Sequence, residues 1–382
     1  IKPLSIPSAQ QRCWAAAMVR HLDQVTCRKD ESGKWVNQYR LLQEVGAGTF
    51  CKVRLAESDQ GCHAVKRFGR MVLQKRMVAK FDAEGAHTVP FQQCIDEEIR
   101  ILGTISHPHV VQLQEVINDP LDDNVYLIFE GLPGGQLMAW NEKTGTYTAQ
   151  PASERLGSAV NDSRPLHAGY SGPIEMDIWV FCERLAKHFA RQLADGIAYI
   201  HSLGVIHKDL KPDNLVLSKT VPWDDGLLCR LDIGGWPELK SESRKAVVPK
   251  VDYQELLVKI ADFNCAEQCQ EPDFEIFDAQ GTQNFTPPEC FRKEDDGIIR
   301  GKPRDMWSLG CVLFVLVYGR CPFWAEDNLL LQLQIMQCEL VLPTGGPLLS
   351  NEWMGLVQSL MSQDPAARPT AEAILQSDWL TK

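Results

Sequence analysis

Residues 205–217 read Val-Ile-His-Lys-Asp-Leu-Lys-Pro-Asp-Asn-Leu-Val-Leu, with polar residues placed between two apolar runs. Asp209 is followed by Lys211 and Asn214, two and five positions later. A carboxylate can accept the proton of a hydroxyl group, a lysine can neutralise a phosphoryl group in transfer, and an amide oxygen can bind Mg²⁺. A surface loop without function is not expected to present all three at this spacing. The stretch therefore predicts a site for phosphoryl transfer.

A second stretch, residues 258–264, reads Val-Lys-Ile-Ala-Asp-Phe-Asn and places Asp262 directly after an apolar strand. Mg²⁺ takes oxygen ligands and binds proteins through one or two carboxylates together with substrate phosphates. We therefore expect Asp262 to be the main magnesium ligand.

A glycine-containing turn lies upstream, between two segments that alternate as β-strands do. Gly46 and Gly48 would let backbone amides approach a phosphate without obstruction by a Cβ atom. On its own the pattern fits a tight hairpin turn equally well, because Cys51 stands where G-x-G-x-x-G has its third glycine.

Lys66 closes the apolar run Ala64-Val65-Lys66. A lysine in this place is either a solvated strand end or a cation for nucleotide phosphates, held by a carboxylate. Glu98 is the partner that we expect, because it lies beside the apolar stripe of a helix predicted over residues 91–102. Glu97 is the alternative.

Apolar periodicity divides the chain into a β-rich front and an α-rich back, which predicts an α+β fold of two lobes. The clearest helix is expected at residues 183–203, and two weaker patterns suggest helices at 10–25 and 71–80. Irregular stretches at about 139–175 and 219–252 read as insertions that loop out from the lobe surface.

These segments, in this order, resemble the eukaryotic protein kinases, as do Pro288-Glu289, residues 305–310 and Arg368. Asn37-Gln38-Tyr39, His107-Pro-His-Val-Val, Phe129-Glu130 and residues 318–323 are more narrowly similar to the calcium/calmodulin-dependent protein kinase kinases. The resemblance implies a leader at 1–38 and a bilobal kinase domain at 39–380. Its N-lobe (39–130) would be β-rich with one main helix, and its C-lobe (131–380) α-rich.

The resemblance also implies a role for individual residues. Asp209 would be the catalytic base and Lys211 the charge stabiliser, with Thr282 contacting both. Lys66, paired with Glu98, would hold the phosphates. The remaining expectations are Asn214 and Asp262 on Mg²⁺; Val45, Val53, Ala64 and Val216 around adenine; a hinge from Glu130 to Leu132, with Phe129 behind the pocket; Asp305 bracing the catalytic loop; and an ion pair between Glu289 and Arg368.

The implied activity is ATP- and magnesium-dependent phosphorylation of serine or threonine. The expected substrates are activation-loop threonines of other Ser/Thr kinases, and calmodulin would bind through segments outside this chain. The alternative is a pseudokinase that serves as a nucleotide-binding scaffold. The five chemical groups Lys66, Glu98, Asp209, Asn214 and Asp262 are all present, which favours the enzyme.

Several positions depart from the kinase pattern. Lys208 replaces the usual arginine, and Asn264 replaces a glycine, where we expect asparagine to tolerate a left-handed backbone. No Ser, Thr or Tyr occurs between Asp262 and Gly281, although five carboxylates do. One hypothesis is that a carboxylate serves Lys208 without phosphorylation; the other is a solvated acidic loop. Cys51 is either a reactive thiol or an inert one.

Composition limits the remaining possibilities. The chain has 382 residues and a formal net charge of -11, which argues against a nucleic-acid partner. No apolar run has the length that a membrane span needs. Thirteen cysteines without a C-x-x-C pair indicate free thiols, Cys265 and Cys269 included, in a reducing cytoplasmic or nuclear compartment. The first residue is Ile1, so we expect the sequence to begin inside a longer protein.

Overall fold

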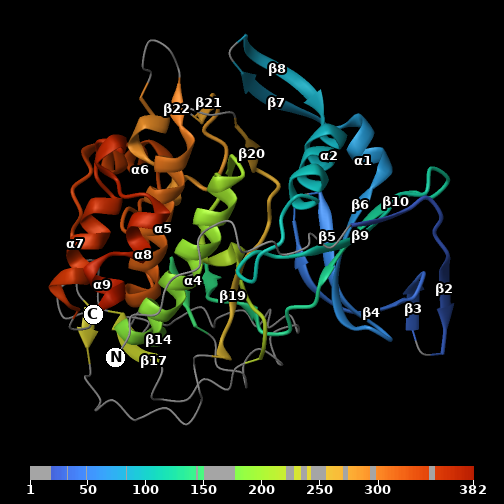
Figure 1. Cartoon of the computed structure of the whole chain (residues 1–382), viewed down its shortest axis with the longest axis horizontal. Helices are drawn as coiled ribbons and strands as arrows, with labels where there is room; N and C mark the ends of the chain where they lie inside the picture. Colours follow the sequence, from blue (N-terminus) through green and yellow to red (C-terminus); the bar gives the residue numbers. More distant parts are fainter. Residues whose placement is uncertain are drawn as a thin grey trace, which may run out of the picture.

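The computed structural model of the chain describes residues 19–31, 33–48, 50–82, 84–142, 145–149, 177–220, 228–233, 239–241, 255–269, 274–292, 298–343 and 349–382. These residues form two lobes, a curled β-sheet with helices beside it and a mainly helical lobe (Figure 1). The α+β bilobal fold predicted from the sequence is therefore present.

The N-lobe is built on an eight-stranded sheet of order β1-β9-β10-β6-β5-β4-β3-β2. Its strands are β1 (Arg20–Leu22), β2 (Cys27–Asp30), β3 (Gly33–Val36), β4 (Tyr39–Ala47), β5 (Cys51–Ser58), β6 (Gly61–Gly69), β9 (Leu113–Ile117) and β10 (Asn124–Glu130). Strands β1 and β2 lie at opposite edges, yet only residues 23–26 join them. The sheet must therefore curl until its two edges approach each other.

A small apolar core fills the inside of this curl. It consists of Val36, Tyr39, Ala56, Val65, Ile117, Tyr126 and Ile128, with Leu22, Val25 and Leu41 packed against it. Across the curl, the thiol of Cys27 in β2 lies 3.7 Å from the Tyr126 hydroxyl of β10. Within the sheet, Arg20 of β1 forms an ion pair of 2.8 Å with Glu115 of the neighbouring β9. The leader thus supplies strands that complete the N-lobe, while the boundary at residue 38 stays a prediction.

The helix expected over residues 10–25 is wrong at Arg20–Leu22, which is the strand β1 paired in parallel with β9. Sheet pairing across a long sequence separation outweighs a weak local pattern there. Residues 1–18 lie outside the described residues.

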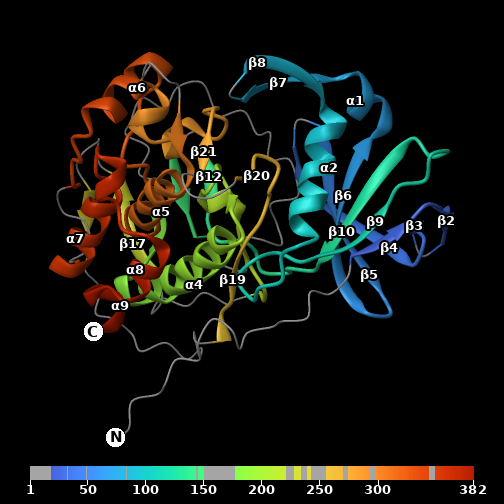
Figure 2. The same ribbon diagram turned by 45° about the horizontal axis from the view of Figure 1, so that its top comes forward.

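The helix expected at 71–80 is only partly present. It ends early as α1 (Arg70–Lys75), and an antiparallel hairpin follows, made of β7 (Met77–Asp82) and β8 (Gly85–Pro90). Gly85 has a φ of 115°, which favours glycine and allows the tight turn. The main helix of the lobe is α2 (Phe91–Leu102). In Figures 1 and 2 the hairpin extends from α1 and α2 toward the C-lobe.

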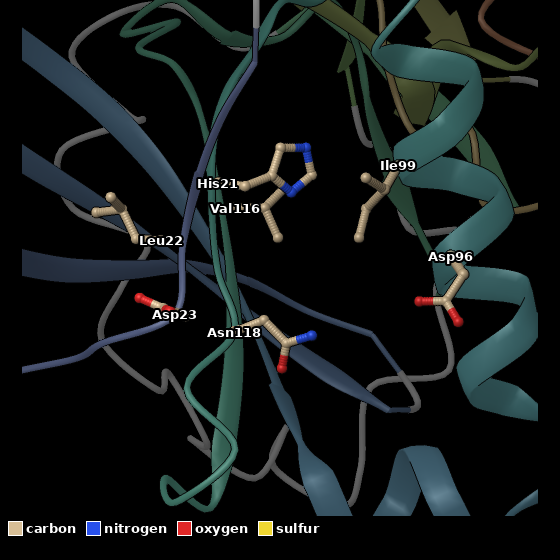
Figure 3. Close-up of a pocket in the computed structure, with 7 residues that line it drawn as sticks. All are labelled: His21, Leu22, Asp23, Asp96, Ile99, Val116 and Asn118. Atoms are coloured by element: carbon tan, nitrogen blue, oxygen red, sulfur yellow. The ribbon is translucent and has the colours of Figure 1, made fainter.

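A cavity of about 470 Å³ separates the leader strand from α2 (Figure 3). His21 of β1, Ile99 of α2 and Val116 of β9 are among the residues that line it. The leader strand is therefore tied to the sheet rather than to α2 at this point.

The C-lobe is centred on two long helices, α4 (Glu183–Ser202) and α5 (Gly301–Tyr318). Helix α4 confirms the prediction for residues 183–203, and α5 is buried along most of its length, with apolar residues on every side from Leu309 onward. The other helices are α6 (Asn328–Gln337), α7 (Asn351–Leu360), α8 (Ala371–Leu375) and α9 (Asp378–Thr381), and 3₁₀ turns occur at Pro212–Asn214, Gln283–Phe285, Pro288–Cys290 and Pro365–Ala367. No described helix has the length and apolar character that crossing a membrane requires.

Short strands at the lobe boundary carry the polar motifs. A three-stranded sheet joins β11 (Gly135–Gln136), β16 (Leu215–Leu217) and β19 (Val258–Ile260). Two further pairs join β15 (Val205–Ile206) with β20 (Glu267–Gln268) and β21 (Glu275–Ile276) with β22 (Ile299–Arg300).

The predicted insertions are more ordered than expected where the structure describes them. The first contains the hairpin of β12 (Ala139–Asn141) and β13 (Thr146–Thr148), whose Tyr147 is buried. Strand β17 (Leu228–Ile233) of the second pairs with β14 (Asp177–Phe181) and with β18 (Leu239–Ser241). The expectation that the second insertion simply loops out is wrong for these strands, because a partner distant in sequence provides their hydrogen bonds. The rest of both insertions lies outside the described residues.

Gly131, which links the two lobes, offers a test of this architecture. A Cβ atom there would lie 2.4 Å from the backbone carbon and oxygen of Cys62, whereas one at Gly355 in α7 would meet nothing within 4 Å. We expect Gly131→Ala to lower the free energy of unfolding by about 2 kcal/mol, since the backbones must separate. Gly355→Ala should raise it by about 0.5–1 kcal/mol. Chemical denaturation checks both, and equal effects would contradict the close approach.

Candidate active site

Lys66 stands at the centre of a buried ionic network. Its Nζ donates to Glu98 Oε1 at 2.8 Å and to Asp262 Oδ1 at 2.9 Å. Burial alone would lower the pKa of Lys66, but the carboxylates of Glu98 and Asp262 outweigh it and hold that pKa above its ordinary value. Glu97, the alternative partner, instead accepts hydrogen bonds from the exposed Arg100. The structure therefore selects Glu98.

The register of the sheet explains why these side chains face one cleft. Lys66 lies opposite Val53 on β5, and Ala64 lies opposite Phe129 on β10. Alternate residues of a strand share a face, so Val53, Ala64, Lys66 and Phe129 lie on the same side of the sheet. Val65, between them, points into the small core of the curl. The predicted adenine contacts and the predicted phosphate lysine are thus brought together.

The remaining residues predicted around adenine are accessible or half-buried. Val45 is 52% exposed despite its apolar side chain, and Val216 of β16 is half-buried. Gly46 and Gly48 follow Val45 at the end of β4, and the Gly48 amide donates to the Cys51 carbonyl at 3.0 Å. The two glycines therefore belong to the turn that joins β4 and β5.

Glu130, at the start of the predicted hinge, connects the two lobes. Its Oε1 accepts hydrogen bonds from the Gln112 amide at 2.8 Å and from Lys259 Nζ at 2.7 Å. Leu132, at the other end of the hinge, packs against the main core. Our sequence reasoning missed Lys259, although a lysine within the apolar strand Val258–Ile260 was a signal that it has a buried partner.

The loop at residues 207–214 forms a closed set of hydrogen bonds around Asp209. Its Oδ1 accepts from the backbone amide and the hydroxyl of Thr282, both at 2.8 Å. Its Oδ2 accepts from Asn214 Nδ2 at 3.1 Å and lies 3.0 Å from Lys211 Nζ. Lys211 in turn donates to the Thr282 hydroxyl at 2.7 Å. All four residues that the sequence placed here meet in one cluster.

Asp305 braces this loop from below. It is fully buried, and its carboxylate accepts from the backbone amides of His207 and Lys208 and from His201 Nε2, each at 2.9 Å. Burial raises the pKa of Asp305, but the bond from His201 and the nearby amides outweigh it and lower the pKa overall. These bonds hold Lys208 at a left-handed φ of 66°.

The segment after β19 turns Asp262 toward Lys66. Phe263 is buried at 1% exposure and packs edge-on against His207, with ring centroids 4.8 Å apart. The left-handed residue is Asp262, with a φ of 62°, and Asn264 is absent from the described residues of positive φ. The left-handed position is thus two residues before Asn264, so the tolerance of asparagine for such a backbone stays a prediction.

Comparison with known proteins identifies the fold. Residues 39–380 match the family model of the protein kinase domain. The chain belongs to the protein kinase family. Among curated relatives, it is 26% identical over 374 residues to a calcium/calmodulin-dependent protein kinase kinase of Caenorhabditis elegans. It is 28% identical over 358 residues to a probable serine/threonine-protein kinase of Dictyostelium discoideum, and 26% over 367 residues to serine/threonine-protein kinase GRIK1 of Arabidopsis thaliana.

These alignments cover 95%, 93% and 95% of the chain. They cover 56%, 39% and 72% of the respective relatives, so the chain spans about half the length of the first two. Two of these three relatives are serine/threonine-protein kinases by name.

The donor atoms of the site fit a magnesium ion. Asn214 uses its amide nitrogen for Asp209, which leaves the amide oxygen for a cation. Asp262 uses Oδ1 for Lys66 and keeps Oδ2. One carboxylate and one amide oxygen beside nucleotide phosphates are the hard oxygen ligands that Mg²⁺ takes. Within the described residues no three His, Cys, Asp or Glu side chains gather as for a metal bound by protein alone.

The activation segment, defined here as residues 262–289, is anchored at two buried cations. Lys208 Nζ donates to Glu267 at 2.9 Å and to both oxygens of Asp278 at 3.0 Å. Arg368 forms two parallel bonds with Glu289, at 2.6 and 2.8 Å. The predicted Glu289–Arg368 pair is present, and two of the five carboxylates between Asp262 and Gly281, Glu267 and Asp278, contact Lys208.

Two further residues of the kinase domain were missed at the sequence level. The Tyr147 hydroxyl donates to Asp213 at 2.7 Å, which places the first insertion beside the catalytic loop. Arg304, fully buried, donates to the backbone carbonyls of Asp278 and Lys208. Tyr147 belongs to no recognisable motif. Arg304 precedes Asp305, and only the aspartate of that pair was assigned a role from the sequence.

The cysteines near the site are free thiols. Burial raises the pKa of the Cys51 thiol despite the opposing charge of Lys66. Burial also raises the pKa of Cys265 and Cys269, each to about 12. The geometry therefore favours the inert alternative for Cys51, because a thiol with a raised pKa holds little thiolate at neutral pH.

Limited alkylation tests this assignment. We expect iodoacetamide at neutral pH to modify Cys51 more slowly than Cys27, because Cys51 is partly buried with a raised pKa whereas Cys27 is exposed. Peptide mass spectrometry at several time points gives both rates in one sample. Selective labelling of Cys51 would contradict the assignment.

Proposed function

We propose that the chain is an active, ATP- and magnesium-dependent protein serine/threonine kinase. The main support is that Asp209, Lys211, Asn214 and Thr282 form one hydrogen-bonded cluster while Lys66 is bonded to both Glu98 and Asp262. All five groups that phosphoryl transfer requires are thus arranged together. No described contact disables any of them, which favours the enzyme over a pseudokinase.

Each residue has a task in this proposal. Val45, Val53, Ala64 and Val216 enclose the adenine, and Lys66 holds the α- and β-phosphates of ATP. Asp209 orients the acceptor hydroxyl and takes its proton, and Lys211 stabilises the charge of the transferring phosphoryl group. Asn214 and Asp262 hold Mg²⁺, which would neutralise charge on the phosphates. The lysine at position 211, two residues after the base, is typical of Ser/Thr rather than Tyr kinases.

We also propose that the protein substrate is another Ser/Thr kinase, phosphorylated on its activation-loop threonine. Support comes from the similarity to a relative whose name is calcium/calmodulin-dependent protein kinase kinase. A calmodulin partner, through segments outside this chain, and action in the cytoplasm or nucleus complete the proposal. The thirteen cysteines without paired spacing fit that reducing compartment.

A transfer assay tests both levels. Native chain and Asp209→Asn are incubated with radiolabelled ATP, Mg²⁺ and a panel of Ser/Thr kinases whose activation-loop threonine is intact or replaced by alanine. We expect label only on intact substrates, with a loss of about a thousandfold in Asp209→Asn, since general-base groups contribute about 10²–10⁴. Equal labelling by both proteins would remove the enzymatic proposal. Nucleotide binding by the native chain without transfer would establish the pseudokinase.

Adjacent glutamates provide a matched pair. Glu98→Gln removes the charge that is bonded to Lys66, so we expect kcat/KM for ATP to fall by about 10- to 100-fold. Glu97→Gln removes the same charge one residue away, where it pairs with a half-exposed arginine, and should change kcat/KM by less than about twofold. Steady-state kinetics decides between them. A larger effect at Glu97 would contradict the assigned pairing.

A further inference from the structure

Lys208 is a buried cation that directly precedes Asp209, the proposed catalytic base, in the sequence. It is 5% exposed and precedes Asp209 in the loop that Asp305 braces. Its amine is bonded to Glu267 and to both oxygens of Asp278. One lysine therefore ties the catalytic loop to two separate points of the activation segment.

The two carboxylates come from positions that differ in local structure. Glu267 belongs to β20, which pairs with β15 immediately before the catalytic loop. Asp278 follows β21, lies only 7% exposed, and accepts the Gln280 amide at 3.1 Å through Oδ1. Glu275 in β21 is exposed. Asp278 is therefore no part of a solvated acidic surface.

The charge at this contact resembles that of a phosphorylated residue. A phosphate carries a charge of about −1.5 to −2 and pairs with cations near catalytic loops. Two carboxylates supply a similar charge permanently. The chain between Asp262 and Gly281 contains no Ser, Thr or Tyr, so no hydroxyl is available there for a phosphate.

We propose that Glu267 and Asp278 are positioning residues that hold the activation segment in its working arrangement through Lys208, so that activity requires no phosphorylation between Asp262 and Gly281. The inference rests on the proposed kinase function.

The contact reaches the catalytic groups by two routes. The first route follows the chain from Asp278 to Thr282, whose amide and hydroxyl donate hydrogen bonds to Asp209. Arg304 holds this stretch in place by donating to the Asp278 carbonyl at 2.8 Å. From Glu267, the next residue, Gln268, accepts a hydrogen bond of 2.6 Å from Arg100 of α2, the helix that carries Glu98. Loss of the contact would therefore loosen the placement of Thr282 and of α2 together.

The experiment compares the native chain with Glu267→Gln/Asp278→Asn, using Glu275→Gln as a matched control that removes a charge from the same segment. We expect the double variant to lose about tenfold in kcat, with a smaller rise in KM for ATP, because Thr282 contacts Asp209 directly whereas α2 is reached only through the exposed Arg100. Glu275→Gln should match the native chain.

Two more variants distinguish the loss of positioning from the effect of leaving the Lys208 charge buried without a partner. Lys208→Arg keeps a cation and should retain activity within about threefold. The triple variant Lys208→Met/Glu267→Gln/Asp278→Asn leaves no unpaired buried charge, and we expect it to remain about as impaired as the double variant. Hydrogen exchange of residues 274–282 should be faster in the double and triple variants and unchanged in Glu275→Gln.

The outcomes are distinct. A fully active double variant, or recovery of activity in the triple variant, would overturn this inference while leaving the proposed function intact. A native chain without any transfer activity would overturn the proposed function and this inference with it. Impaired double and triple variants beside an active native chain would support both.

Discussion

The buried carboxylate of Asp305 holds the arrangement on which the site depends. Three donors converge on it, two of them backbone amides of the catalytic loop. A buried carboxylate is tolerated only when its oxygens accept hydrogen bonds. If the loop shifted, Asp305 would lose two of its donors and remain buried without them, which is energetically costly. The same bonds keep Lys208 left-handed. Its side chain and that of Asp209 consequently diverge, one toward Glu267 and Asp278, the other toward Thr282.

The two lobes are joined by ionic contacts at opposite sides of the cleft. Lys66 of β6 reaches Asp262 of the activation segment, and Glu130 of the hinge reaches Lys259 of β19. Because Lys259 lies three residues before Asp262, both contacts end on one short stretch of chain. That stretch begins in the three-stranded sheet with β16, which carries Val216. The placement of both Lys66 and Glu130 therefore depends on the same segment, residues 259–262.

Short-range patterns and the resemblance to protein kinases were enough to name most of the residues that the structure gathers at the candidate site. The spacing of Asp209, Lys211 and Asn214 and the side of the helix that carries Glu98 are local properties, and the structure brings these groups together. What the sequence did not reveal depends on pairing between distant segments. Strand β1 forms by hydrogen bonding to β9, which lies about ninety residues later in the sequence. Strands β14 and β17 pair although the whole 207–214 loop lies between them in the sequence. The Glu130–Lys259 and Tyr147–Asp213 contacts join residues with no common motif. Periodicity along the chain carries no information about such partners.

The leader strands explain why Lys66 faces the cleft and not the inside of the sheet. Alternation along β6 puts Val65 into the small core of the curl and the neighbouring Ala64 and Lys66 on the other side. That core is closed by Leu22 and Val25 of the leader and by Val36 of β3. A slip of one residue would bring Lys66 into an apolar core and Val65 to the nucleotide side, and the cost of burying an unpaired amine prevents it. The strands that precede the matched kinase domain therefore help to fix the register from which Lys66 projects.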